Sequence, residues 1–243
     1  MILTDEKEKK PEKEKKPKEE KKPKEENKPE GDDVALEEVD DTMLLNLFAG
    51  SESREESKPR IMGIYGDITS EKCAEAIYHM LILKDNGKRF EREDPEDEDS
   101  KEIEVYEPFK FLLSTFGGSA LDMFAVYDMM RLIKKDCDIE TLGMGKVMSA
   151  GVLLLAAGTK GKRKIGASCR VMIHGVISGQ HGHLHDLKNE MAEAKVTEKM
   201  YVEALAAETK MSVPYIRRMI KKRSNIYLDA KKALELGIVD EII

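Results

Sequence analysis

The 243-residue sequence has no tryptophan, only three cysteines and 5% aromatic residues. The cysteines, Cys73, Cys137 and Cys169, are too few and too scattered for a disulfide framework or a cysteine-based zinc site. No apolar run approaches the ~20 residues that cross a bilayer, and the first residues lead into charge without the apolar segment of a secretory signal. The net charge of −7 argues against a general nucleic-acid binder. We therefore expect a soluble, cytoplasmic protein that binds neither nucleic acid nor membrane.

Charged residues are abundant, and they concentrate near the N-terminus. They make up 37% of the chain, against about 25% in ordinary globular proteins. Residues 5–33 are almost entirely Lys, Glu, Asp and Pro, and a proline recurs every six residues from Pro11 to Pro29. This repeat has almost nothing to bury, so no burial offsets the entropy of ordering it. We predict a low-complexity tail and flexible segment over 1–58, with a partner-docking arm as the open alternative, and one folded domain over 59–243.

Strands and helices alternate through the folded part. Apolar runs closed by glycine turns indicate buried strands, and apolar residues at helical spacing after a Ser or Thr cap indicate amphipathic helices. These patterns predict strands at 61–68, 109–115, 139–144, 164–167, 169–174 and from 238, and helices at 70–83, 120–133, 152–157, 184–210, 212–221 and 229–236. Such alternation predicts an α/β fold with right-handed crossovers. The acidic stretch over 84–104 is expected to be an exposed insertion.

Three places on this framework are suited to catalysis. Ser149 lies at a turn between a predicted strand and a predicted helix, where backbone N–H groups can hold an oxyanion beside its hydroxyl. The pair Gly117 and Gly118 lets backbone approach a ligand closely. His174 ends a buried strand at the rim of the sheet, where site residues collect. Each also has a structural explanation when taken alone: a helix cap, a tight turn and a core histidine.

Three further histidines, His181, His183 and His185, alternate with other residues and suggest a metal site. Their spacing suits only an extended segment, however, and no nearby cysteine or pair of carboxylates completes a coordination sphere. We therefore expect that no metal is bound.

Several blocks of the sequence, in the same order, resemble the ClpP family, the proteolytic subunits of the ATP-dependent Clp protease. The resemblance covers roughly residues 60–243. Its blocks are the glycine pair followed by Tyr127 and Asp128, the stretch after Ser149 (Leu153 to Gly158, then Lys160 to Arg163), Arg170 to His174, and Ala233 to Asp240. Agreement of several blocks is far more specific than any single motif.

This resemblance implies a fold and an activity. The fold would be a crotonase-like α/β unit of repeated β-β-α turns, and the helix from about Leu184 would be its protruding handle. The activity would be that of a serine endopeptidase that hydrolyses unfolded polypeptides inside a barrel of two stacked heptameric rings, a tetradecamer. An AAA+ Clp unfoldase would feed the barrel and would alone use ATP, so the peptidase itself would need no cofactor.

The resemblance also implies roles for particular residues. Ser149 would be the nucleophile and His174 its general base, and the N–H groups of Gly118 and Ala150 would form the oxyanion hole. Counting back from the C-terminal block, the third triad position falls on Asn225.

The third triad position is where the sequence departs from the family. The count falls on Ser224 instead of Asn225 if the short gap is placed differently, and neither residue is a carboxylate. Asp229 is nearby, but it stands where the next helix starts and is favoured as a cap. An asparagine can orient an imidazole but brings no countercharge. A weakly active or inactive Clp-like structural or regulatory subunit is therefore the alternative. A crotonase-type acyl-CoA enzyme is a third reading, disfavoured because such enzymes rely mostly on carboxylates.

Overall fold

The computed structural model describes residues 59–97, 99–179, 181–221 and 225–243, so the predicted tail and Ser224 lie outside the described residues. Within this part a seven-stranded sheet forms the centre of the fold. Along one path lie β1 (Ile61–Ile68), β4 (Phe109–Gly118), β5 (Ile139–Met148), β6 (Arg163–Ile165) and β9 (Glu241–Ile242). Strand β7 (Arg170–Ile173) pairs with β5, and β8 (Ile226–Leu228) pairs antiparallel with β7. The other pairings within this sheet are parallel, which confirms the predicted α/β fold.

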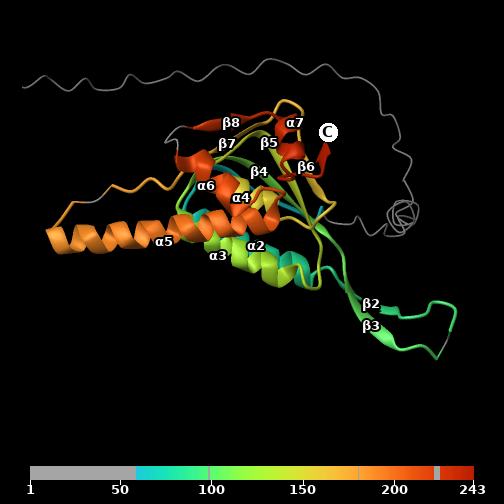
Figure 1. Cartoon of the computed structure of the whole chain (residues 1–243). Helices are drawn as coiled ribbons and strands as arrows, with labels where there is room; N and C mark the ends of the chain where they lie inside the picture. The colour runs from blue at the N-terminus through green and yellow to red at the C-terminus, as the bar shows by residue number, and fades with distance from the viewer. Residues whose placement is uncertain (1–58, 98, 180, 222–224) are drawn as a thin grey trace, which may run out of the picture. The chain divides into compact units, whose positions relative to one another are not determined.

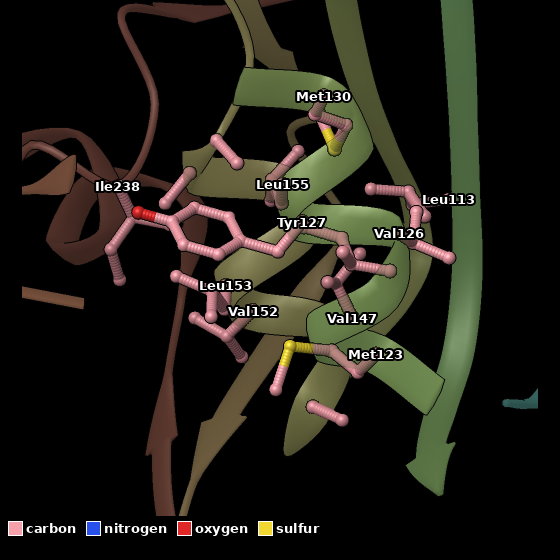
Figure 2. Packing of buried hydrophobic residues seen from close by; sticks show 14 of the residues in the cluster. Leu113, Met123, Val126, Tyr127, Met130, Val147, Val152, Leu153, Leu155 and Ile238 are labelled. Carbon is pink, nitrogen blue, oxygen red and sulfur yellow. The ribbon is translucent and has the colours of Figure 1, made fainter. Parts of the chain in front are cut away.

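Three helices pack around this sheet near its centre (Figure 1). They are α2 (Ser70–Asp85), α3 (Ala120–Ile133) and α4 (Ala150–Ala156). Thr69 and Ser119 cap α2 and α3, because their hydroxyls accept hydrogen bonds from the N–H groups of Lys72 and Asp122. Every residue of α4 is buried. Figure 2 shows side chains of α4 packed against those of α3 and of strands β4 and β5. This packing fixes the start of α4, immediately after Ser149.

Strand β5 is longer than the sequence predicts. The prediction ends it at Met144, where Gly145 suggests a turn, yet the strand continues to Met148. Gly145 has φ +65°, which a residue without Cβ adopts at little cost. Before this bend β5 pairs with β6, ending at Gly143, and after it β5 pairs with β7. The glycine therefore lets β5 exchange its partner β6 for β7 instead of ending. The chain then reaches Ser149, which lies beside the end of β7.

The long helix α5 (Leu184–Glu208) confirms the predicted handle. Its buried residues begin only at Thr197, and its first half extends beyond the sheet (Figure 1). The other end is anchored by charge: Glu208 accepts a hydrogen bond from Tyr127 at 3.1 Å and pairs with Lys160 at 3.2 Å. Burial and the Glu208 carboxylate raise the pKa of Tyr127 to about 12, so the phenol remains a donor. This anchor fixes the second half of α5 against the core.

Helices α6 (Val213–Lys221) and α7 (Ala230–Glu235) follow close to their predicted places. The acidic insertion is exposed, as predicted, but it folds into a hairpin of β2 (Lys88–Arg92) and β3 (Glu102–Tyr106). Charged residues dominate β2, which therefore lacks the apolar alternation of a strand. In β3, Glu102 and Glu104 alternate with Ile103 and Val105, a strand pattern that the prediction overlooked. No helix in the described residues is long and apolar enough to cross a membrane.

Candidate active site

Ser149 has a strained backbone. Its φ is +53° and its ψ −123°, and it is the one residue other than glycine with positive φ in the described part of the chain. Such a conformation costs about 1–3 kcal/mol and is found mainly at functional sites. Although Ser149 immediately precedes α4, its hydroxyl makes no capping hydrogen bond. The structural explanation as a helix cap therefore does not apply to this serine.

Three hydrogen bonds hold the Ser149 backbone in this conformation. Its N–H donates to the Met172 carbonyl at 2.7 Å, and its carbonyl accepts from the Val152 N–H at 3.0 Å. The Tyr201 hydroxyl, on α5, also donates to this carbonyl at 3.1 Å. Tyr201 is buried, and burial raises its pKa, so it stays protonated as a donor. Strand β7, helix α4 and the handle thus jointly impose the conformation of Ser149.

This strain predicts an unusual order of stabilities. We expect Ser149→Gly to be about 1 kcal/mol more stable than Ser149→Ala, because glycine adopts positive φ without a Cβ clash. Chemical denaturation of the two variants measures the difference. Ala157 has φ −79°, so Ala157→Gly should instead destabilise the protein by about 1 kcal/mol. Equal stabilities of the two Ser149 variants would contradict the inferred strain.

Gly117 and Gly118 bring the end of β4 against Ser149. Gly117 has φ +95°, and a Cβ there would lie 2.5 Å from the Ser149 Cβ; Gly118 has φ +153°, and its Cβ would lie 2.2 Å from the Ile68 carbonyl oxygen. The Gly117 N–H donates to the buried Thr115 hydroxyl at 2.9 Å. Glycine is therefore required at both positions by sterics, and the turn delivers backbone to the nucleophile candidate.

One cavity of about 410 Å³ brings the predicted residues together. Ser149, Ala150, Gly118 and His174 all line it, although they come from three separate stretches of the sequence. Ala150 is the first residue of α4, so its N–H has no partner within the helix. The other lining residues are partly apolar and include Phe116, Met123, Val176 and Ile177. The cavity therefore combines a hydroxyl, an imidazole and backbone donors with apolar walls.

The imidazole of His174 is held in one tautomer. Its Nδ1 lies 2.5 Å from the carbonyl oxygen of Gly175. A carbonyl oxygen can only accept, so Nδ1 carries the proton and Nε2 is left as the basic nitrogen. Within the described residues no hydrogen bond joins His174 to the Ser149 hydroxyl. Catalytic hydrogen bonds are often long when no substrate is bound. The observation that places the two residues in one site is therefore the cavity that both of them line.

Asn225 lies across from His174. Strands β7 and β8 are antiparallel, and their last pair is Ile173 with Ile226, so the next residues in register are His174 and Asn225. Both line a second cavity, of about 770 Å³. No hydrogen bond between them occurs in the described part of the chain, since the Gly175 carbonyl occupies Nδ1.

Asp229 lies at the other end of β8. The four-residue separation from Asn225 corresponds to roughly 13 Å along the strand. Its carboxylate accepts from the Lys232 N–H at 2.8 Å and caps α7. The prediction that Asp229 is a cap is confirmed.

Sequence reasoning missed three residues that support this site: Thr115, Tyr201 and Glu198. Tyr201 is the one aromatic residue of α5. An isolated aromatic residue in a helix rich in Ala, Glu and Lys is a sequence feature that could have identified it. Glu198, also on α5, accepts from the Val176 N–H at 3.2 Å. It is one of many charged residues on that helix, so the sequence alone does not distinguish it.

The histidines before the handle are not gathered into a site. His181, His183 and His185 are exposed, and His183 immediately precedes α5. Among the described residues no group of three or more His, Cys, Asp or Glu side chains is placed to hold a metal ion.

Comparison with known families shows which family the chain matches. A family model described as Clp protease matches residues 54–243. The matched range contains all the candidate site residues, including Ser149, His174 and Asn225.

Proposed function

Since this chain belongs to the Clp protease family and is a ClpP-type peptidase, we propose that it is a serine endopeptidase that cleaves unfolded polypeptides. The observation that carries this proposal is Ser149 itself. Its backbone is strained, its hydroxyl does not cap α4, and it lines one cavity with His174, Gly118 and Ala150. A serine held in a strained backbone conformation, with a base and backbone donors beside it, has the properties of an activated nucleophile.

In this proposal His174 Nε2 takes the proton of the Ser149 hydroxyl as Oγ attacks the substrate carbonyl carbon. The N–H groups of Gly118 and Ala150 hold the oxyanion of the tetrahedral intermediate. His174 then donates its proton to the leaving amine, which leaves an acyl-enzyme on Ser149. Water repeats the sequence and releases the acid. The proposed chemistry uses no cofactor and no metal.

Asn225 occupies the third triad position in this proposal. Its amide can contribute a hydrogen bond to the imidazole but cannot offset the positive charge that develops there. The apolar walls of the cavity, including Phe116 and Met123, favour an apolar substrate side chain next to the scissile bond.

Exposed apolar side chains support assembly into rings. Leu121 and Leu132 on α3 are 64% and 53% exposed, and Leu184 and Met191 on α5 are 64% and 61% exposed. Contacts between copies of the chain would remove these side chains from water, which is favourable. The proposed assembly is a pair of stacked heptameric rings enclosing the Ser149 sites, with an AAA+ Clp unfoldase as the partner that uses ATP.

Light scattering at micromolar concentration tests this assembly. We expect a mass near fourteen, or at least seven, times the 27.5 kDa of one chain. A monomeric mass would exclude the ring. Deletion of residues 5–33 is expected to leave the number of subunits in the particle unchanged, because that segment has almost nothing to bury.

A specific observation favours a second function, that of a weakly active or inactive ring subunit. Asn225 provides no carboxylate, and within the described residues Ser149 and His174 are not hydrogen-bonded to each other. A structural or regulatory subunit needs neither feature.

Fluorophosphonate labelling followed by mass mapping separates the two functions. An active serine peptidase should carry the phosphonyl group on Ser149, and His174→Ala should greatly slow its attachment because the base is lost. Absence of labelling on Ser149 in the assembled wild-type protein would favour the regulatory subunit.

A further inference from the structure

The peptide group between Gly175 and Val176 is hydrogen-bonded on both sides. On one side its carbonyl oxygen accepts from Nδ1–H of His174, with 2.5 Å between the heavy atoms. On the other side its N–H donates to the Glu198 Oε2 at 3.2 Å. One peptide unit therefore connects the imidazole to a carboxylate. Hydrogen bonds in such a chain polarise one another and are stronger together than apart.

Gly175 makes this arrangement possible. A Cβ at Gly175 would lie 2.9 Å from Glu198 Oε2, closer than real Cβ atoms normally approach. Any larger residue would push the carboxylate away from the peptide group. Glu198 is itself partly buried on the anchored half of α5. Both the glycine and the fixed helix thus place the carboxylate beside the residue that follows His174.

The cationic side chains around His174 disfavour a positive imidazole, so a nearby carboxylate would stabilise the imidazolium. The cavity that His174 shares with Asn225 is lined by four cationic side chains and one carboxylate, that of Glu198, among the described residues. The charged residues that line the two cavities together with His174 are Lys195, Lys199 and Glu198 from α5, Arg217 and Lys221 from α6, and Asp67 at the end of β1. Four cations oppose a positive imidazole, because like charges disfavour one another. Glu198 is the charge in this lining that favours it.

We propose that Glu198 is a positioning residue that replaces the missing triad carboxylate, acting on His174 through the Gly175–Val176 peptide group. The inference rests on the proposed serine peptidase function. When Ser149 attacks, the proton moves from Oγ to Nε2, and the imidazole becomes positively charged. Nδ1–H remains on the ring, and no proton reaches Glu198. The carboxylate draws the Val176 N–H, increases the negative charge on the Gly175 oxygen and so stabilises the imidazolium and its tautomer.

Glu198→Gln tests this proposal, because it keeps the side-chain shape and removes the charge. We expect kcat/KM for a short fluorogenic peptide to fall about three- to tenfold, which corresponds to roughly 0.7–1.4 kcal/mol of barrier. The acid limb of the pH profile of kcat/KM should move to lower pH than in the wild type, because the imidazolium loses a favourable charge. Glu193→Gln removes an exposed charge from the same helix and is the matched control.

Gly175→Ala approaches the same contact from the other side. The added methyl group displaces the Glu198 carboxylate without changing any charge. We expect a similar loss of activity, and little additional loss when Gly175→Ala is combined with Glu198→Gln. Independent sites would instead give losses that multiply.

Three outcomes would overturn the proposal while leaving the peptidase function intact. Glu198→Gln could retain activity within twofold of wild type. It could lose activity with no shift of the pH profile, which would make Glu198 a purely structural contact of Val176. The losses of the two variants could also multiply. An inactive, unlabelled wild-type protein would instead mean that the proposed function itself has failed.

Discussion

Ser149→Ala is expected to lower kcat/KM for a small unstructured peptide by at least about 10³-fold, or roughly 4 kcal/mol of barrier. The alanine keeps the Cβ, so the backbone around residue 149 and the hydrogen bonds from its N–H and carbonyl should persist. Only the nucleophilic oxygen is lost. The remaining donors of Gly118 and Ala150 can still bind a carbonyl, but without an acyl-enzyme they give only weak residual catalysis.

The assay compares steady-state peptide hydrolysis by the two proteins at equal subunit concentration. Ser100→Ala is the control, because Ser100 lies in the exposed hairpin and accepts a hydrogen bond from the Asp94 N–H. It should retain wild-type activity. Activity of Ser149→Ala within tenfold of wild type would place the nucleophile elsewhere and reject the proposed mechanism. Loss of the assembled form by light scattering would show that the variant has misfolded.

The sequence predicts the framework well, because the framework depends on local patterns. Helix α3 has the predicted bounds, and Asp229 caps α7 as expected. Strand β5 shows where this reasoning stops. Gly145 suggests a turn in sequence, and only the positions of β6 and β7 determine that the strand bends there and continues.

The site was predictable only where its residues carry a recognisable motif. Local patterns mark Ser149, His174 and the glycine pair as candidates, the family resemblance assigns their roles, and the structure brings them to one cavity. The strain at Ser149 could not be inferred, because it depends on Met172 and Tyr201, which are distant in sequence. Glu198 was equally hidden. Glu198 differs from the many other charged residues of α5 because it accepts a hydrogen bond from the main-chain N–H of Val176. No residue pattern in the sequence predicts such a contact.

Asn225→Asp is expected to raise peptidase activity at least tenfold, or about 1.4 kcal/mol of barrier. The change supplies a carboxylate directly opposite His174, in the register set by the pair Ile173–Ile226. Exchange of a triad carboxylate for an amide costs about 10⁴ in a well-studied serine protease, so the reverse change should recover part of that. The cationic residues of the shared cavity should keep the introduced carboxylate ionised at neutral pH. Peptide hydrolysis at pH 7 measures the effect.

Asp229→Asn is the matched control for this gain, because asparagine keeps the cap of α7 and removes a charge at the other end of β8. It should leave activity unchanged. If Asn225→Asp is no faster while Asp229→Asn is inactive, the third triad residue is Asp229.

Combining Asn225→Asp with Glu198→Gln decides how His174 is supported. A carboxylate at position 225 that takes over Nδ1–H from the Gly175 carbonyl makes the peptide link to Glu198 redundant. Glu198→Gln should then cost less than twofold in this background, against about three- to tenfold in the wild type, a coupling that a double-mutant cycle detects. If the cost is the same in both backgrounds, the introduced carboxylate does not bind His174, because two groups cannot hold the same ring proton independently.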